Sequence, residues 1–390
     1  MPVASLGAEE LKAVDADRIE SLCGLAASGL ERMHDPGSPM FCDVYNRTSE
    51  GLVRVGVSHR YTMMTLLGLQ RYETSIGPSP VKIGPVLEAL LNDVSWVAGV
   101  GDLGLLLWTC AELAPVRVPA LCERLRVLGA MKRTSDGRQG HTMEVAWYLT
   151  GIASCHLAGY PDLPGLASEA AEARQALESN RGDSGIFGHQ FRGGSWAGRT
   201  RGRIGTFADQ VYPAIAFSRL AQALEDESAG AMALRTAKKM CELQGPLGEW
   251  SWRYDSVSGR VVSRYPIYSV HQHAMGPMML LSVSEATGRE FNEALERSLA
   301  WIGGANELGR DFVEPSLGLI WRSIRLGLVD SASDSVLRYF GYRQGHVGTS
   351  RLKVCYECRP YELGWLLYAL AGQTRSSRLA GRPHAKQASD

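Results

Sequence analysis

The chain has 390 residues, of which 45% are hydrophobic, and its 41 basic residues equal its 41 acidic ones. This balance excludes the basic excess that a nucleic-acid-binding surface normally carries. The chain is long enough to bury a large core, and its apolar runs are shorter than the roughly 20 residues of a membrane-spanning helix. We therefore expect neither a nucleic-acid partner nor a membrane span.

The start of the chain, MPVASLGAEELKAVDADRIE, is acidic and has no apolar stretch of the kind found in signal peptides. The eight cysteines lie mostly alone within helical patterns, as reduced thiols do, without the paired spacing of a disulfide framework. We therefore predict a cytoplasmic protein.

Two kinds of segment alternate along the chain. In the first kind, apolar residues recur every three or four positions opposite a polar face, as in a half-buried helix. These segments are residues 7–33, 85–97, 118–132, 163–180, 229–244 and 290–304. The second kind is apolar almost all round, as in a helix buried on every side. These segments are 57–73, 101–114, 140–159, 205–224, 271–288, 315–327 and 359–372.

Buried helices that alternate with half-exposed ones predict an inner ring inside an outer ring. The expected fold is an all-α protein, an α/α toroid of six or seven helical hairpins, over a single domain at residues 1–372. An open α-solenoid is the alternative, although its helices would be more polar. Strands are expected only as a short hairpin within 249–269, and the polar tail 373–390 is predicted to be disordered.

The segment QGPLGEW, residues 244–250, follows a predicted outer helix and matches the pattern Q-x-x-x-G-x-W. A weaker echo is NRGDSGIF at 180–187. The pattern resembles the QW motif of the squalene and terpene cyclases, whose α/α toroid is related to that of the protein prenyltransferases. This resemblance implies a structural role for Gln244, Gly248 and Trp250, in which the motif fastens an outer helix to its turn.

The resemblance does not extend to terpene chemistry. The acidic D-x-D-D string of class II cyclases and the D-D-x-x-D string of class I enzymes are both missing from the sequence. A terpenoid or isoprenoid cyclase with a nonstandard acid stays an alternative. A fold likeness does not carry a function with it.

The strongest functional signal is a recurrence of polar residues at the starts of the predicted inner helices. In a toroid these helices run parallel, so their first turns, with unpaired backbone donors and positive dipole ends, share one opening. Each such residue taken alone is also explained as a helix cap. The recurrence predicts a polar pocket at that opening.

The stretch RYPIYSVHQHAMGPMM, residues 264–279, is the densest of these starts. Pro277 lies too deep for a first helical turn that begins at His271, so the helix is expected to kink or to begin near 274. Either arrangement leaves His271 and His273 in a loop over the cavity. Tyrosine, histidine and arginine together suit proton abstraction beside a carboxylate, as in β-elimination or epimerisation of uronic acids.

Paired carboxylates offer a second chemistry, because glycoside hydrolysis needs an acid and a base whose separation sets the stereochemistry. A metal site is less well supported. Cys355 and Cys358 form a C-x-x-C after His346, but a single C-x-x-C lacks the second pair of ligands typical of zinc. We predict no metal ligands and no cofactor, with a zinc-dependent cyclase or transferase kept as an alternative.

The sequence thus favours an enzyme that acts on a carbohydrate or glycoconjugate, as a uronate lyase or epimerase or as a glycoside hydrolase. An alternative is a toroid without catalytic activity, and the sequence does not determine the oligomeric state. The predicted catalytic residues are Tyr265, Tyr268, His271, His273, Asp209, His141 and Glu144. The predicted substrate-binding residues are Arg60, Asp102, Tyr212, Trp252, Arg264, Arg359 and Glu362.

Overall fold

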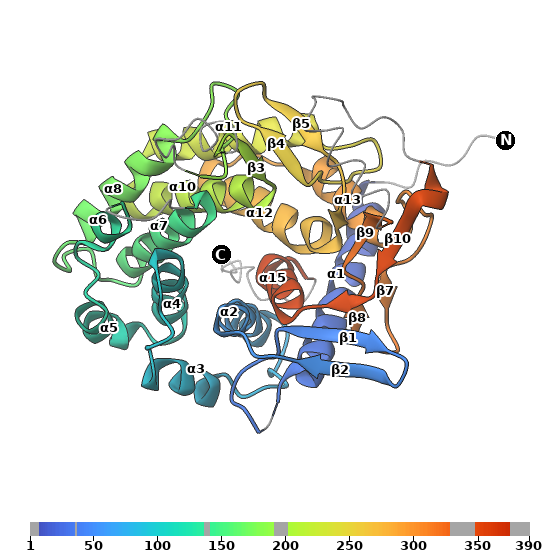
Figure 1. Cartoon of the computed structure of the whole chain (residues 1–390), viewed down its shortest axis with the longest axis horizontal. Coiled ribbons are helices and arrows are strands. Elements are labelled where there is room, and N and C mark those ends of the chain that lie inside the picture. The colour runs from blue at the N-terminus through green and yellow to red at the C-terminus, as the bar shows by residue number, and fades with distance from the viewer. Residues whose placement is uncertain (1–7, 36, 136–140, 191–201, 328–347, 375–390) are drawn as a thin grey trace, which may run out of the picture.

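The computed structural model describes residues 8–35, 37–135, 141–190, 202–327 and 348–374. Helices form two concentric layers around a common axis, as Figure 1 shows. The inner helices are α2 (His59–Ser75), α4 (Val100–Leu113), α7 (Thr142–Leu157), α10 (Ala208–Leu224), α12 (Gly276–Thr287) and α15 (Pro360–Leu370). The outer helices are α1 (Ala8–Met33), α3 (Ile83–Asn92), α5 (Val118–Arg124), α6 (Ala130–Ser135), α8 (Leu166–Ser179), α11 (Glu227–Leu243) and α13 (Asn292–Ile302).

The inner helices form a closed ring. Each packs against the next in the order α2, α4, α7, α10, α12 and α15, and α15 returns to α2. Glycines allow the final closure, because a Cβ on Gly68 of α2 would lie only 2.0 Å from the carbonyl oxygen of Gly364 in α15. The predicted α/α toroid is confirmed, with six inner helices in the described part of the chain.

The apolar pattern explains which helix takes which layer. Inner helix α4 is buried at every position from Val100 to Ala111, whereas outer helix α11 buries only one face. Asp226 caps α11 by accepting hydrogen bonds from the backbone of Ser228 and Ala229. No helix in the described ranges is long and apolar enough to cross a membrane.

Strands cover one end of the ring, and the expectation that they would be nearly absent is wrong. The described strands are β1 (Val44–Thr48), β2 (Gly51–Val55), β3 (Ile204–Thr206), β4 (Arg253–Asp255), β5 (Arg260–Ser263), β6 (Ile267–Tyr268), β7 (Val313–Glu314), β8 (Leu319–Ile320), β9 (Ser323–Leu326), β10 (Leu352–Cys355) and β11 (Glu357–Cys358). They form antiparallel sheets in the orders β11-β1-β2, β10-β9-β6, β3-β4-β5 and β7-β8. The expected hairpin within 249–269 is β4–β5.

The predicted seventh inner helix at 315–327 is also wrong. This segment forms the end of the β7–β8 hairpin and then β9. The turn before β8 contains Gly318 at φ +66°, a left-handed conformation that glycine adopts without strain. The apolar run LGLIW had been attributed to a helix, but a short apolar run fits a buried strand equally well.

The QW-like segment follows α11 and fastens it to its neighbour. The Gln244 amide donates to the carbonyls of Gly248 at 2.9 Å and Ala294 of α13 at 3.0 Å. Trp250 is fully buried and donates from its ring nitrogen to Ser298 at 2.8 Å. Asn180, which follows α8, makes a comparable pair of hydrogen bonds. Its side-chain amide donates to the Thr142 hydroxyl at 2.6 Å and to the Gly188 carbonyl at 2.9 Å. Gln244, Trp250 and Asn180 are not among the residues that line the cavity described below.

Candidate active site

The first turns of the inner helices meet at one end of the barrel, here called the site end. Side-chain contacts pass from each helix start to the next around this end. In order, they join Arg60 with Asp102 and Glu144, Trp147 with Tyr212, Phe207 with His271, Tyr268 with Arg322, and Arg359 with Tyr61. The first turns of the inner helices are therefore neighbours at one end of the barrel.

Arg60 of α2 joins two of the predicted acidic residues. Its Nε lies 2.5 Å from Oδ1 of Asp102, and its Nη2 lies 2.9 Å from Oε1 of Glu144. Burial opposes the guanidinium charge, but Asp102 and Glu144 outweigh it and raise the pKa of Arg60. Arg60 is 36% exposed and Glu144 is 24% exposed, whereas Asp102 is buried behind the guanidinium.

A histidine that was not predicted completes this part of the site. Nδ1 of His189 lies 2.9 Å from Oδ2 of Asp209, which also accepts hydrogen bonds from the backbone and hydroxyl of Thr206, both at 2.8 Å. The hydrogen bond from His189 to Asp209 raises the pKa of His189 although burial opposes the shift. The His189 side chain is 38% exposed and Asp209 is buried, so the pair presents an imidazole held by a fixed carboxylate.

His141 lies beside this pair, with its ring centroid 4.8 Å from that of His189. Its Nδ1 is buried and has no hydrogen-bond partner in the described structure, and the same holds for Oδ1 of Asp209. Two unsatisfied polar atoms in one place are costly unless a ligand or water binds them. The group therefore has the character of a binding site.

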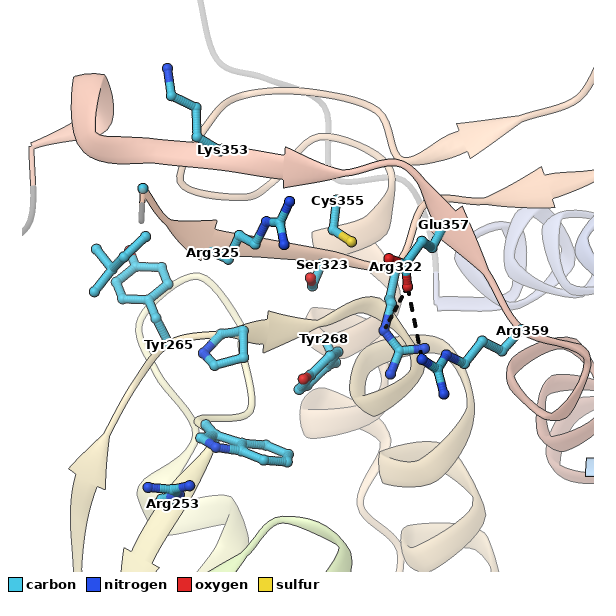
Figure 2. Close-up of a pocket in the computed structure, with 14 residues that line it drawn as sticks. Arg253, Tyr265, Tyr268, Arg322, Ser323, Arg325, Lys353, Cys355, Glu357 and Arg359 are labelled. Atoms are coloured by element: carbon cyan, nitrogen blue, oxygen red, sulfur yellow. Dashed lines mark ion pairs between the residues drawn. The ribbon is translucent and has the colours of Figure 1, made fainter. Parts of the chain in front are cut away.

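A cavity of about 540 Å³ lies at the same end, between the β10-β9-β6 sheet and the Trp252–Arg253 segment (Figure 2). The register of the sheet explains which residues line it. Tyr268 pairs with Ser323, and Ser323 pairs with Cys355. These three residues line the cavity, whereas the next row, Ile267, Ile324 and Val354, lies on the opposite face, as the pleat requires.

Positive charge dominates the cavity. Among the described residues, its lining contains Arg253, Arg322, Arg325, Lys353 and Arg359 and one carboxylate, Glu357. Arg322 donates to Oε1 of the buried Glu362 at 2.7 Å, and its guanidinium carbon lies 5.0 Å from the ring centroid of Tyr268. Such a lining attracts anions, because guanidinium groups match carboxylate and phosphate geometry.

The predicted residues divide between three positions. Tyr265, Tyr268, Trp252 and Arg359 line the cavity. Arg60, Asp102, Glu144, His141 and Asp209 form the group at the starts of α2, α4, α7 and α10. Tyr212, Glu362 and Arg264 serve neighbouring side chains: Tyr212 accepts from Trp365 at 2.9 Å, Glu362 binds Arg322, and Arg264 binds Glu249 and Glu307.

The expectation that His271 and His273 lie in a loop over the cavity is wrong. They belong to a π-helical turn (His271–Met275) that precedes α12, with Pro277 in the first turn of that helix. Both are buried, at 3% and 0% exposure. Burial lowers the pKa of each histidine to about 3. Neither nitrogen of His273 has a hydrogen-bond partner in the described structure.

The residues that sequence reasoning missed are His189, Arg253, Arg322, Arg325 and Lys353. Four of them lie on or beside strands, in segments that had been interpreted as a helix, a loop or a minor hairpin. The signal available for one of them was the alternation in SIRLG, in which Arg325 shares one face of β9 with Ser323. A strand assignment would have placed both residues on one face, but the position of that face on the cavity wall depends on strand pairing.

The C-x-x-C motif is divided between two environments. Cys355 lines the cavity on β10, whereas Cys358 is fully buried on β11, and burial raises the pKa of each thiol. His346 lies outside the described residues. Among the residues that the structure describes, no group of three or more histidine, cysteine, aspartate or glutamate side chains is arranged to hold a metal ion.

No family model matches this sequence, and no curated protein matches it either. Solved structures do match the fold. An unsaturated glucuronyl hydrolase specific for heparin is 13% identical, with a TM-score of 0.58 over 93% of this chain and 98% of that one. The unsaturated glucuronyl hydrolase of Bacillus sp. GL1 is 13% identical, with a TM-score of 0.59 over 94% and 97%.

A sugar epimerase from a ruminal bacterium is 10% identical, with a TM-score of 0.62 over 92% of this chain and 98% of that one. These proteins share the α/α toroid with the chain over nearly its full length. Identities this low establish the shared fold and leave the reaction to be argued from the site.

Proposed function

We propose that this protein is an enzyme that acts on a carbohydrate containing a uronic acid, by proton transfer at the site end of the barrel. The observation that carries the proposal is the juxtaposition of an arginine-lined cavity with the His189–Asp209 pair at one end. The two are electrostatically connected, because Arg253 of the cavity wall and Glu144 both act on the pKa of His189.

In this proposal the carboxylate of the uronic acid binds beside Arg322 and Arg359, next to Tyr268. Those cations withdraw charge from the carboxylate and so ease removal of the proton on the neighbouring carbon. His189 transfers the proton through its exposed Nε2, and Asp209 fixes the ring and stabilises its charged form. In an elimination, the glycosidic oxygen on the next carbon leaves as the double bond forms and takes the proton from His189. In an epimerisation, a second acid, to which we assign Tyr268, returns a proton to the opposite face of the carbon.

Glycoside hydrolysis is the second candidate. One observation favours it: Asp102 and Glu144 flank the same guanidinium at the opening, so two carboxylates are held at a fixed separation. The unsaturated glucuronyl hydrolases of the same fold agree with this candidate. A terpenoid cyclase has less support, because Trp252, Tyr265 and Tyr268 share the described cavity lining with five cationic side chains, whereas a carbocation needs mainly aromatic walls.

The test is a substrate panel analysed by proton NMR. Saturated and unsaturated uronic-acid disaccharides, together with a neutral disaccharide, are incubated with the purified protein. Only the uronates should be consumed, with a new double bond or an inverted centre for the first reaction class and a cleaved glycosidic bond for the second. Consumption of the neutral sugar at the same rate, or of no uronate, would overturn the proposal.

A further inference from the structure

Two cations occupy paired positions on the cavity wall, and neither forms an ion pair with a described carboxylate. Arg325 of β9 and Lys353 of β10 are directly paired residues of adjacent antiparallel strands, and both line the cavity. Both side chains are exposed, and no carboxylate in the described part of the chain forms an ion pair with either. Figure 2 shows the two residues on their neighbouring strands.

This pairing is unfavourable in the empty protein. Side chains of directly opposed residues project from the same face, and like charges in that position destabilise a sheet. Two other cations of the cavity differ in this respect, because Arg322 has Glu362 and Arg359 has Glu357 within 4.0 Å. A bound anion between Arg325 and Lys353 would remove the repulsion.

The sheet register also places this pair relative to the rest of the site. Tyr268, Ser323 and Cys355 form one row across β6, β9 and β10, and Pro266, Arg325 and Lys353 occupy the next positions on the same face. Two residues along a strand span about 7 Å. The cation pair is therefore displaced by roughly the width of one sugar ring from the Tyr268 row.

We infer that Arg325 and Lys353 form an oxyanion subsite that binds a sulfate or phosphate ester on the saccharide, one position away from the group beside Tyr268. The saccharide in this assignment rests on the proposed function, whereas the anion rests on the cavity alone. Arg253 lies across the cavity and adds to the positive potential. A tetrahedral oxyanion has enough acceptor oxygens to engage both cations at once.

The first experiment measures binding of inorganic sulfate by calorimetry at constant ionic strength. Arg325→Gln combined with Lys353→Gln should weaken binding by about tenfold or more, as expected for loss of charge-assisted hydrogen bonds. The matched control is Arg289→Gln, which removes an exposed arginine in the turn after α12 and should bind sulfate normally. Equal binding by the double variant would overturn the subsite.

A charge reversal separates lost binding from lost folding. Arg325→Glu replaces the cross-strand repulsion with an ion pair to Lys353, so its melting temperature in sulfate-free buffer should equal or exceed that of the wild type. It should nevertheless lose sulfate binding. A variant that is stable and still binds sulfate as tightly as the wild type would contradict the inference.

The second experiment compares a uronic-acid disaccharide with and without a sulfate ester. The wild type should bind the sulfated sugar about tenfold more tightly, and Arg325→Glu should bind both equally. If inorganic sulfate binds at the pair but the sulfated sugar has no advantage, the pair holds a free anion and the saccharide assignment is wrong. Calorimetry needs no turnover, so a protein that shows this preference but converts no uronate would overturn only the proposed reaction.

Discussion

The two ends of the barrel contain similar residues in opposite circumstances. At the end away from the cavity, Glu112 of α4 accepts hydrogen bonds from Trp108 at 2.8 Å, Tyr368 at 2.9 Å and Arg219 at 2.5 Å. Arg71 adds an ion pair to Glu112 at 3.9 Å. At the site end, His141, Asp209, Arg325 and Lys353 keep polar atoms or charges that no described residue satisfies.

Helix polarity explains where the charges lie but not this difference. Asp102, Glu144, Asp209 and Glu362 all lie in first turns, where the positive end of the helix dipole favours anions. The two ends differ in how completely their polar atoms and charges are paired. Complete pairing indicates a structural network, whereas leftover binding capacity around a cavity indicates a place for a ligand.

The largest expected effect is at the site end. His189→Gln should lower kcat by about 10²- to 10⁴-fold, the usual contribution of a general acid or base, on whichever uronate is turned over. Stability should change by only about 1–2 kcal/mol, the range of ordinary single substitutions. His156→Gln, in the last turn of α7 at the other end, is the matched control and should retain activity. Full activity in His189→Gln would remove it from the mechanism.

The next largest effect is expected in the Glu112 network at the opposite end of the barrel. Glu112→Gln leaves Arg219 and Arg71 without their counter-charge. The free energy of unfolding should fall by about 3 kcal/mol, the lower end of the range for breaking a buried ion pair. The lower end applies because the Glu112 side chain is 17% exposed. Urea unfolding measures the loss, and the kcat of the folded protein should stay unchanged. Tyr368→Phe removes a hydroxyl that donates to Glu112 and accepts from Arg219 and Arg71, and should cost about 1–3 kcal/mol. A fall in kcat without a fall in stability would contradict a purely structural role.

A further prediction concerns the acid sensitivity of the fold, which is measured per pH unit. The pKa values of His271 and His273 are about 3 in the folded protein and about 6.5 when unfolded. The unfolded chain therefore binds protons first as the pH falls below 6.5, and stability decreases toward pH 3, by about 1.4 kcal/mol per pH unit for each histidine. Urea unfolding between pH 7 and 4 measures this slope.

His273→Leu tests the assignment of that slope. Because no described group bonds to either nitrogen of His273, an apolar side chain of similar size should be tolerated. The variant should lose about one histidine's share of the acid sensitivity. An unchanged slope would mean that other groups drive acid unfolding.

The inner ring could be predicted from the sequence because a helix that is apolar on every face must be buried on every side. Residues 101–114 and 359–372 were assigned correctly as α4 and α15 on that basis. Only half of the site could be predicted from the sequence. Arg60, Asp102 and Glu144 stand in the first turns of helices, where capping and dipole preferences mark them.

The strand-borne half could not be predicted in the same way. Arg322, Arg325 and Lys353 become neighbours of Tyr268 only through pairings between β6, β9 and β10, which join residues far apart in the chain. His189 depends on a contact with Asp209 across twenty residues. Local patterns carry no information on such register, and the burial of His271 and His273 likewise follows from the packing around the π-helical turn.

The close approach of Gly68 and Gly364 has a consequence for biosynthesis. The last described inner helix seals against the first, so the ring cannot shut until the ribosome has made residue 370 and released it. Until then, the hydrophobic face of α2 that packs against α15 is exposed in the nascent chain. An alanine methyl group would lie 2.0 Å from the Gly364 carbonyl oxygen at position 68, or 2.7 Å from the Cα of Thr65 at position 364, so either substitution should hinder closure of the ring.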